Sequence, residues 1–180
     1  MTRSEADLHT DRQAIHEVVL HYCRAVDRLD LDGVRDAYSD TGVDHHTGFS
    51  GTAEEYVAWL AGLLPRLDGT MHLVANHLCE LHGDEAIAET YGTAVHWGEP
   101  AEDPRLNFTS GFRYVDHFVR TAAGWRIQER FAVREWTRSD ATQRLTPEAE
   151  GPRGRRGPTD PLRVLQARLR DGTVGGGAHG

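Results

Sequence analysis

The chain has 180 residues, of which 38% are hydrophobic and 27% charged, and its formal net charge is −8. This length and composition are typical of one globular domain with a core of its own. The acidic balance argues against nucleic acid as the main partner, because acidic protein repels the phosphate backbone, and no run approaches the roughly 20 apolar residues of a membrane span.

The first residues, MTRSEADLHTDRQ, are polar and do not resemble a signal peptide, so a cytoplasmic protein is expected. Residues 138–180 hold eight arginines and five acidic residues, about +3, which leaves about −11 on residues 1–137. All twenty basic residues are arginine, so the chain has no lysine for Schiff-base catalysis. Its two distant cysteines, Cys23 and Cys79, predict neither a disulfide framework nor a structural zinc site.

Helical periodicity marks the first third of the chain. Residues 7–29 predict an amphipathic helix with one apolar stripe, made of Ile15, Val18, Val19, Tyr22, Val26 and Leu29. A short second helix is expected in DLDGVRDAYSD, after Asp30 as a possible N-cap, and GVDHHTGFSG is expected to be a short extended segment. Residues 52–64 predict a third helix, because Thr52 and Glu55 occupy the positions of a capping box.

The hydrophobic period then changes to two, which is typical of strands. Four strands are predicted, over residues 70–82, 84–97, 107–120 and 124–136. Helices followed by consecutive strands indicate an α+β fold, with the helices on one face of an antiparallel sheet. From about residue 138 the chain is rich in Pro, Gly and Arg and predicts a tail, in which 161–170 could form one short helix.

Strand parity separates the two histidines of GTMHLVANHL (69–78). Successive side chains of a strand point to opposite faces, so His72 shares a face with Asn76 while His77 lies on the other face. In the next strand, His96 ends a face of small residues, which leaves room for a cavity. Taken alone, each histidine is more often a structural or surface group than a catalyst.

The adjacent His45 and His46 also point opposite ways in an extended segment, so only one of them can face a pocket. A metal site is conceivable from Asp44, His45, His72 and His96. No HxxxH or HExxH spacing supports it, and no metal is expected.

On the first helix, Tyr22 lies within the apolar stripe, where its hydroxyl needs a partner once buried. Asp27 lies on a neighbouring line of the helix, so periodicity alone describes it as a solvated carboxylate near the helix end.

Five stretches, in their order and spacing, resemble the SnoaL-like branch of the nuclear transport factor two superfamily, close to scytalone dehydratase and the bile-acid dehydratases. They are YCRAVDRLDLDGVRDAYSD, VDHHTGFSGTAEEYVAWL, GTMHLVANHL, AIAETYGTAVH and FRYVDHFVRTAAGWRI, and they span about residues 10–137. The resemblance implies a cone over residues 1–137: a strongly curved antiparallel or mixed sheet wrapped around three N-terminal helices, with a deep pocket in its mouth.

The resemblance also implies site residues. In these dehydratases an Asp at the end of the first helix pairs with a His on the first long strand, and Asp27 and His72 match those positions. A helix tyrosine five residues before the Asp matches Tyr22, and a second pocket histidine matches His96. The expected substrate contacts are His45, Asn76, Phe112, Tyr114 and Phe131. His45, Phe112 and Tyr114 depart from the residue types of scytalone dehydratase, which puts the substrate in doubt more than the chemistry.

Together these residues predict a dehydratase that needs no cofactor. Asp27 would fix the tautomer of His72, whose other ring nitrogen would remove a proton alpha to a carbonyl. Tyr22, with His45 or a water, would hydrogen-bond the carbonyl oxygen, and His96 would deliver a proton to the departing hydroxyl. A pocket of small and aromatic residues suits a small apolar metabolite of polyketide, steroid or terpenoid type.

Four other functions stay open. An aldol-type cyclase or a double-bond isomerase would begin with the same proton abstraction. An epoxide hydrolase would need an Asp–Arg–Asp arrangement, to which Asp27 with Arg113 or Arg134 could contribute, but no clear second Asp is seen. In a non-catalytic ligand-binding cone, Asp27 and His72 would be a buried structural pair.

The predicted outer face of the sheet is apolar for a surface in contact with water, because it carries Tyr91, Val95 and Trp97. Cones of this superfamily often pair through that face. The resemblance therefore implies a homodimer, or otherwise a homotrimer.

Overall fold

The computed structural model describes residues 4–141 and 154–171. The chain divides into two compact units, Met1–Arg144 and Leu145–Gly180. In the described part of the second unit, Asp160 caps the helix α4 (Pro161–Arg170) by accepting a hydrogen bond from the Leu162 N–H. Other residues of the predicted tail, 142–153 and 172–180, lie outside the described residues. None of the described helices has the length and apolarity needed to cross a bilayer.

The long helix α1 (Glu5–Asp27) begins at a capping box formed by Ser4 and Asp7. Its apolar stripe is the centre of the core: Ile15, Val19, Tyr22 and Val26 are all buried. Burial of a continuous stripe fixes which side of α1 faces the sheet, and therefore where the polar groups at its C-terminal end point.

Two shorter helices complete the helical layer of the first unit. The helix α2 (Leu31–Asp36) begins at Asp30, whose carboxylate accepts a hydrogen bond from the Gly33 N–H, and it is shorter than predicted because β1 already starts at Tyr38. The helix α3 (Ala53–Leu63) has the predicted capping box, formed by Thr52 and Glu55. A single 3₁₀ turn, η1 (Leu64–Arg66), follows α3 and contains Pro65.

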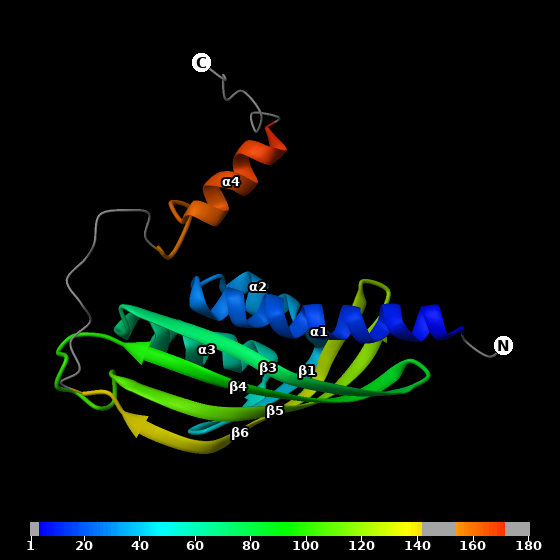
Figure 1. Cartoon of the computed structure of the whole chain (residues 1–180), viewed down its shortest axis with the longest axis horizontal. Coiled ribbons are helices and arrows are strands. Elements are labelled where there is room, and N and C mark those ends of the chain that lie inside the picture. Colours follow the sequence, from blue (N-terminus) through cyan, green and yellow to red (C-terminus); the bar gives the residue numbers. More distant parts are fainter. Residues whose placement is uncertain (1–3, 142–153, 172–180) are drawn as a thin grey trace. The chain divides into compact units, whose positions relative to one another are not determined.

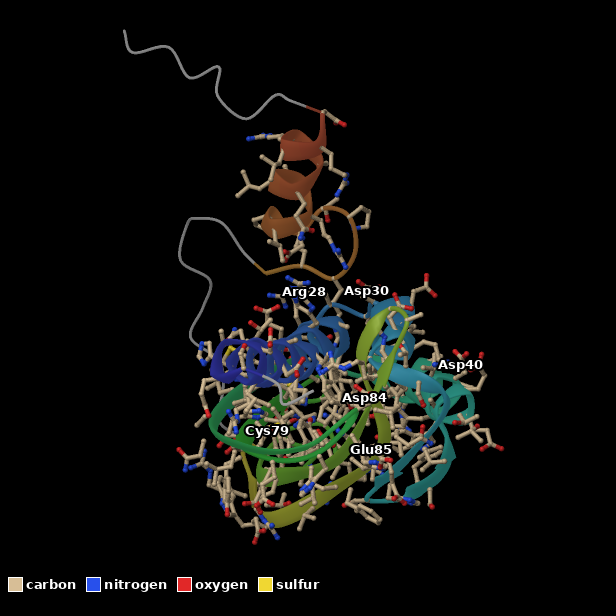
Figure 2. The ribbon with its side chains drawn as sticks, turned by 90° about the vertical axis from the view of Figure 1, so that its right-hand side faces the viewer. Arg28, Asp30, Asp40, Cys79, Asp84 and Glu85 are labelled. Atoms are coloured by element: carbon tan, nitrogen blue, oxygen red, sulfur yellow. The ribbon has the colours of Figure 1, made fainter. Side chains whose placement is uncertain are left out.

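The sheet curves around these helices, which lie on one side of it (Figure 1; Figure 2, turned by 90°, gives a second view). Its strands are β1 (Tyr38–His46), β2 (Phe49–Thr52), β3 (Gly69–His82), β4 (Glu85–Trp97), β5 (Phe108–Thr121) and β6 (Gly124–Ser139). The strand order is β2-β1-β6-β5-β4-β3, and the sheet is mixed because β1 pairs with β6 in parallel while the other neighbours are antiparallel. The predicted α+β fold with a curved sheet around three helices is confirmed. The expected single extended segment after α2 is instead the hairpin β1–β2.

A bulge in β3 changes the predicted parity. Val74 pairs with Gly92 and His77 pairs with Thr90, so two residues of β3, Ala75 and Asn76, stand opposite one residue of β4. Such an extra residue reverses the alternation beyond it. The prediction that His77 lies on the face opposite to that of His72 is therefore wrong: its ring stacks on His16 of α1 at 4.6 Å between centroids.

Candidate active site

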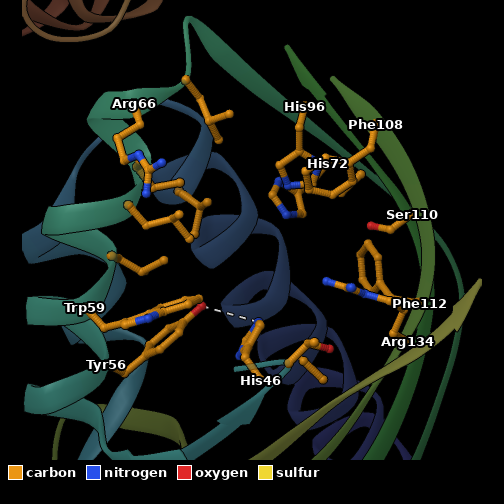
Figure 3. A pocket seen from close by; sticks show the side chains of 18 of the residues that line it. His46, Tyr56, Trp59, Arg66, His72, His96, Phe108, Ser110, Phe112 and Arg134 are labelled. Atoms are coloured by element: carbon orange, nitrogen blue, oxygen red, sulfur yellow. Dashed lines mark hydrogen bonds between the residues drawn. The ribbon is translucent and has the colours of Figure 1, made fainter. Parts of the chain in front are cut away.

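A cavity of about 460 Å³ lies in the first unit, between the helices and the concave face of the sheet (Figure 3). Its walls are mostly aliphatic and aromatic, with Trp59 from α3 and Phe108 and Phe112 from β5 among them. Its polar lining residues are Tyr22, His46, Thr47, Tyr56, Arg66, His72, His96, Arg105, Ser110, Tyr114 and Arg134. A mainly apolar cavity with a few convergent polar groups is the usual form of a small-molecule site.

Asp27 and His72 form a hydrogen-bonded pair at one end of this cavity. The carboxylate lies 2.7 Å from Nδ1 of His72, and it accepts two further hydrogen bonds, from the backbone N–H of His72 at 3.0 Å and the Thr70 hydroxyl at 2.9 Å. Burial alone would raise the pKa of Asp27, but these hydrogen bonds outweigh it and hold the pKa below its ordinary value. With Asp27 ionised, Nδ1 carries the hydrogen, and Nε2 of a neutral His72 is left free to accept a proton.

His96 lies beside His72, with 6.2 Å between the ring centroids, and stacks on Phe108 at 4.1 Å. Burial, followed by the nearby His72, lowers the pKa of His96 to about 4. At neutral pH this imidazole is therefore uncharged. It can accept or donate a hydrogen bond in the pocket, but it is a poor source of a proton.

Tyr22 reaches the cavity from the core stripe of α1 and finds its partner on α3. The hydroxyls of Tyr22 and Tyr56 are 2.6 Å apart, and the Tyr56 hydroxyl lies 3.3 Å from Nε2 of His46. Burial raises the pKa of both tyrosines well above the ordinary value. Both remain neutral hydroxyls at physiological pH, able to donate and to accept.

A buried ion pair packs against the rings of Tyr22 and Tyr114. Arg130 and Asp116 are both fully buried and joined by two parallel hydrogen bonds of 2.7 Å. The guanidinium of Arg130 lies 4.3 Å from the ring centroid of Tyr22 and 3.9 Å from that of Tyr114. These cation–π contacts fix two rings of the cavity floor.

The structure brings together most of the residues predicted for the site. Tyr22, His72, His96, Phe112 and Tyr114 line the cavity, and Asp27 bonds His72 from behind.

Three predicted substrate contacts do not line this cavity. His45 and Phe131 point to the convex side of the sheet, where their rings stack at 4.6 Å. Asn76 is exposed in the bulge of β3. Because side chains alternate along β1, His46 points into the cavity in place of His45, the substrate contact that was expected.

The metal site considered from the sequence is not assembled. His45 points away from the cavity that His72 and His96 line, so the four proposed metal ligands do not converge. Among the described residues, no three His, Cys, Asp or Glu side chains are grouped so as to hold a metal ion. Of the two arginines considered for an epoxide hydrolase, Arg113 forms ion pairs with Glu89 and Glu135, whereas Arg134 lines the cavity.

Sequence reasoning missed several lining residues. On α3, Tyr56, Trp59, Leu60 and Leu63 follow the spacing of one helical face, and this stripe could have revealed them. On β1, the burial of Asp44, which shares a face with His46, places His46 rather than His45 on the concave side, and this burial is not visible in the sequence.

Comparison with known proteins gives a consistent picture. The family model described as a SnoaL-like domain matches residues 8–131. The uncharacterized protein Rv2910c of Mycobacterium tuberculosis (strain ATCC 25618 / H37Rv) is 27% identical over 126 residues, which cover 67% of this chain and 83% of the relative.

Among solved structures, the Kfla4162 protein of Kribbella flavida is 24% identical, with a TM-score of 0.67 over 73% of this chain and 95% of that one. A protein of Novosphingobium aromaticivorans DSM 12444, provisionally named a scytalone dehydratase, is 17% identical with a TM-score of 0.67, covering 82% and 100%. A hexachlorocyclohexane dehydrochlorinase, LinA Type2, is 15% identical with a TM-score of 0.67, covering 84% and 99%. At these identities the likeness shows a shared fold.

Proposed function

The chain belongs to the SnoaL-like domain family, and from that premise we propose that it is a cofactor-independent dehydratase. The observation that carries this proposal is the Asp27–His72 pair in a mainly apolar cavity. Two structural neighbours, named for dehydration and for dehydrochlorination, are consistent with elimination chemistry in this fold.

In the proposed reaction, Nε2 of His72 removes a proton alpha to a substrate carbonyl. Asp27 stabilises the imidazolium that results, because the charge forms next to an ionised carboxylate. The Tyr22 hydroxyl donates to the carbonyl oxygen as negative charge develops there. The His72 imidazolium returns its proton to the departing hydroxyl, and the neutral His96 hydrogen-bonds that hydroxyl as it leaves as water.

The proposed substrate is a small apolar metabolite of polyketide, steroid or terpenoid type that carries a hydroxyl beta to a carbonyl. A cavity of about 460 Å³ lies within the usual size of small-ligand sites. Trp59, Phe108 and Phe112 offer faces for flat rings. Phe112 and Tyr114 hold the positions where the sequence departs from scytalone dehydratase, so the substrate is expected to differ from scytalone.

Replacing either member of the pair tests this function. Asp27→Asn and His72→Ala should each lower kcat about 10²- to 10⁴-fold, because proton abstraction loses its base or the partner that orients it. Turnover is measured by mass spectrometry as loss of water from candidate β-hydroxy carbonyl compounds. The matched control is His117→Ala, since His117 pairs with Glu85 and does not line the cavity. Normal turnover by folded Asp27→Asn and His72→Ala would exclude the proposed reaction, and binding without any turnover in the native protein would favour a ligand-binding cone.

The proposed assembly is a homodimer formed through the convex face of the sheet. This face carries several exposed apolar side chains: Met71, Leu73, Leu78, Ile87, Tyr91 and Phe131 are each between 41% and 71% exposed. Several exposed apolar side chains on one face of a sheet are a common feature of protein interfaces.

A further inference from the structure

A second Asp–His pair faces the same cavity as Asp27–His72. Asp44 and His46 are alternate residues of β1 and therefore share a face of the sheet. Asp44 is fully buried, and its carboxylate accepts hydrogen bonds from the Tyr38 hydroxyl and from Nδ1 of His46. Figure 3 shows His46 and His72 on different parts of the cavity wall, with open space between them.

The second pair is connected to Tyr22 by an unbroken line of hydrogen bonds. Nε2 of His46 lies 3.3 Å from the Tyr56 hydroxyl, which lies 2.6 Å from the Tyr22 hydroxyl. Asp44 holds the hydrogen on Nδ1, so Nε2 is the ring nitrogen at which His46 gains or loses a proton. The line begins at the Asp44 carboxylate, which only accepts, and continues to the cavity through one imidazole and two hydroxyls, each of which can both donate and accept.

The two tyrosines cannot supply a proton by themselves. Burial raises the pKa of Tyr22 and of Tyr56, so a lone tyrosinate would be costly at this position. Each hydroxyl can release its proton at low cost only when the next group replaces it in the same step. A protonated His46 beside the Asp44 carboxylate is a donor that can start such a transfer.

We propose that His46, held by Asp44, is the proton source of the reaction, and that Tyr56 and Tyr22 pass its proton to the substrate carbonyl oxygen. This proposal rests on the proposed function, since it assigns the acid that acts opposite the base His72.

The proton movements balance in two steps. In the first, Nε2 of His72 takes the alpha proton and the electron pair of that C–H bond forms the enol C=C bond. The carbonyl oxygen meanwhile takes the proton of Tyr22, Tyr22 takes that of Tyr56, and Tyr56 takes that of His46. In the second, the enol proton returns along the same line to His46 as the C–O bond breaks. The departing hydroxyl takes the proton from His72 and leaves as water.

The ring of His46 has a fixed position among titratable groups of the neighbouring elements. The titratable groups near its ring are Asp44 on its own strand, Tyr56 on α3, and Tyr114 and Asp116 on β5. The ring also stacks on Tyr56 at 4.8 Å between centroids, which keeps its orientation fixed.

The first test needs no substrate. ¹⁵N NMR of histidine-labelled protein reports which ring nitrogen carries hydrogen, and His46→Gln assigns the signals of His46. We expect neutral His46 to carry hydrogen on Nδ1, and Tyr56→Phe to shift the Nε2 resonance more than the Nδ1 resonance. A neutral ring with hydrogen on Nε2, or an Nε2 signal that ignores Tyr56→Phe, overturns the relay whatever the outcome for Asp27 and His72.

The second test is kinetic and uses matched neighbours. His46→Gln and Tyr56→Phe should each lower kcat about 10- to 100-fold, change KM less than threefold and reduce the solvent isotope effect on kcat. His45→Gln and Tyr91→Phe, which carry the same changes outside the cavity, should leave all three values unchanged. Wild-type kcat in folded His46→Gln and Tyr56→Phe overturns the relay while the Asp27 and His72 results still decide the proposed function.

Discussion

Two histidines on the concave face are held in surroundings that disfavour their charged form. Burial, with a further contribution from the neighbouring His16, lowers the pKa of His77 to about 4, and burial does the same for His96. The two histidines differ in their surroundings. The ring of His77 lies between α1 and β4 and is hydrogen-bonded to the Thr90 hydroxyl at 2.8 Å, whereas His96 lines the cavity.

The stability of the protein is therefore expected to fall in mild acid. A histidine with an ordinary pKa near 6.5 when unfolded and about 4 when folded binds its proton more readily in the unfolded state. Its contribution is complete above pH 6.5 and is lost as the pH falls towards 4, at up to about 1.4 kcal/mol per pH unit for each group. Urea unfolding at pH 7.5, 6 and 5 measures this slope.

His77→Gln should make that pH dependence less steep, even if it lowers stability at every pH. The control is Leu20→Gln at an exposed position of α1, which neither adds nor removes a titratable group and should leave the slope unchanged. An unaltered slope in His77→Gln would mean that His77 is protonated equally well in both states.

At the scale of elements, the bulge of β3 decides which side chains meet α1. Before the bulge His72 and Val74 face the helices, and beyond it His77 and Cys79 do so. If all the present residues of β3 alternated regularly, the second half of the strand would turn Leu78, now 71% exposed, inward and His77 outward. The bulge therefore lets one strand serve both the cavity and the core.

Deleting Asn76 should remove the bulge but keep this arrangement. Ala75 alone would then stand opposite Tyr91, and the pairs Val74–Gly92 and His77–Thr90 can both persist, so His77 still faces the helices and the free energy of unfolding should fall by no more than about 2 kcal/mol. Asn76→Ala keeps the residue count and changes only an exposed side chain, so it should lie within about 0.5 kcal/mol of the wild type. Denaturant unfolding of both variants provides the comparison, and a loss of several kcal/mol on deletion would show that the fold needs the bulge itself and not only the alternation on either side of it.

At the scale of the whole molecule, the two faces of the sheet serve different purposes. The concave face buries charged and polar groups that support the cavity, including Asp44, Asp116 and Arg130. The convex face combines apolar side chains with ion pairs such as Arg113 with Glu89 and Glu135. A surface with both features is suited to pairing with another copy in register.

The proposed dimer is tested by light scattering at micromolar concentration. The wild type should have the mass of a dimer, and Leu73→Arg should shift it to a monomer, because the new charge would be buried in the interface. A monomeric wild type would contradict the assembly, and a dimer unaffected by Leu73→Arg would place the interface elsewhere.

Periodicity by itself determined the α+β class, the positions of the three N-terminal helices and the four long strands, because amphipathic period is a local property of sequence. Resemblance to relatives added the pairing of Asp27 with His72, which helical spacing alone did not require.

Tertiary structure decided the features that depend on contacts between distant parts of the chain. The bulge of β3 depends on how β3 and β4 are paired, and it reversed the predicted face of His77. The choice between His45 and His46 depends on the parallel pairing of β1 with β6, which is made across 84 residues or more. Tyr56 became part of the site only because α3 packs against the strand that carries His46.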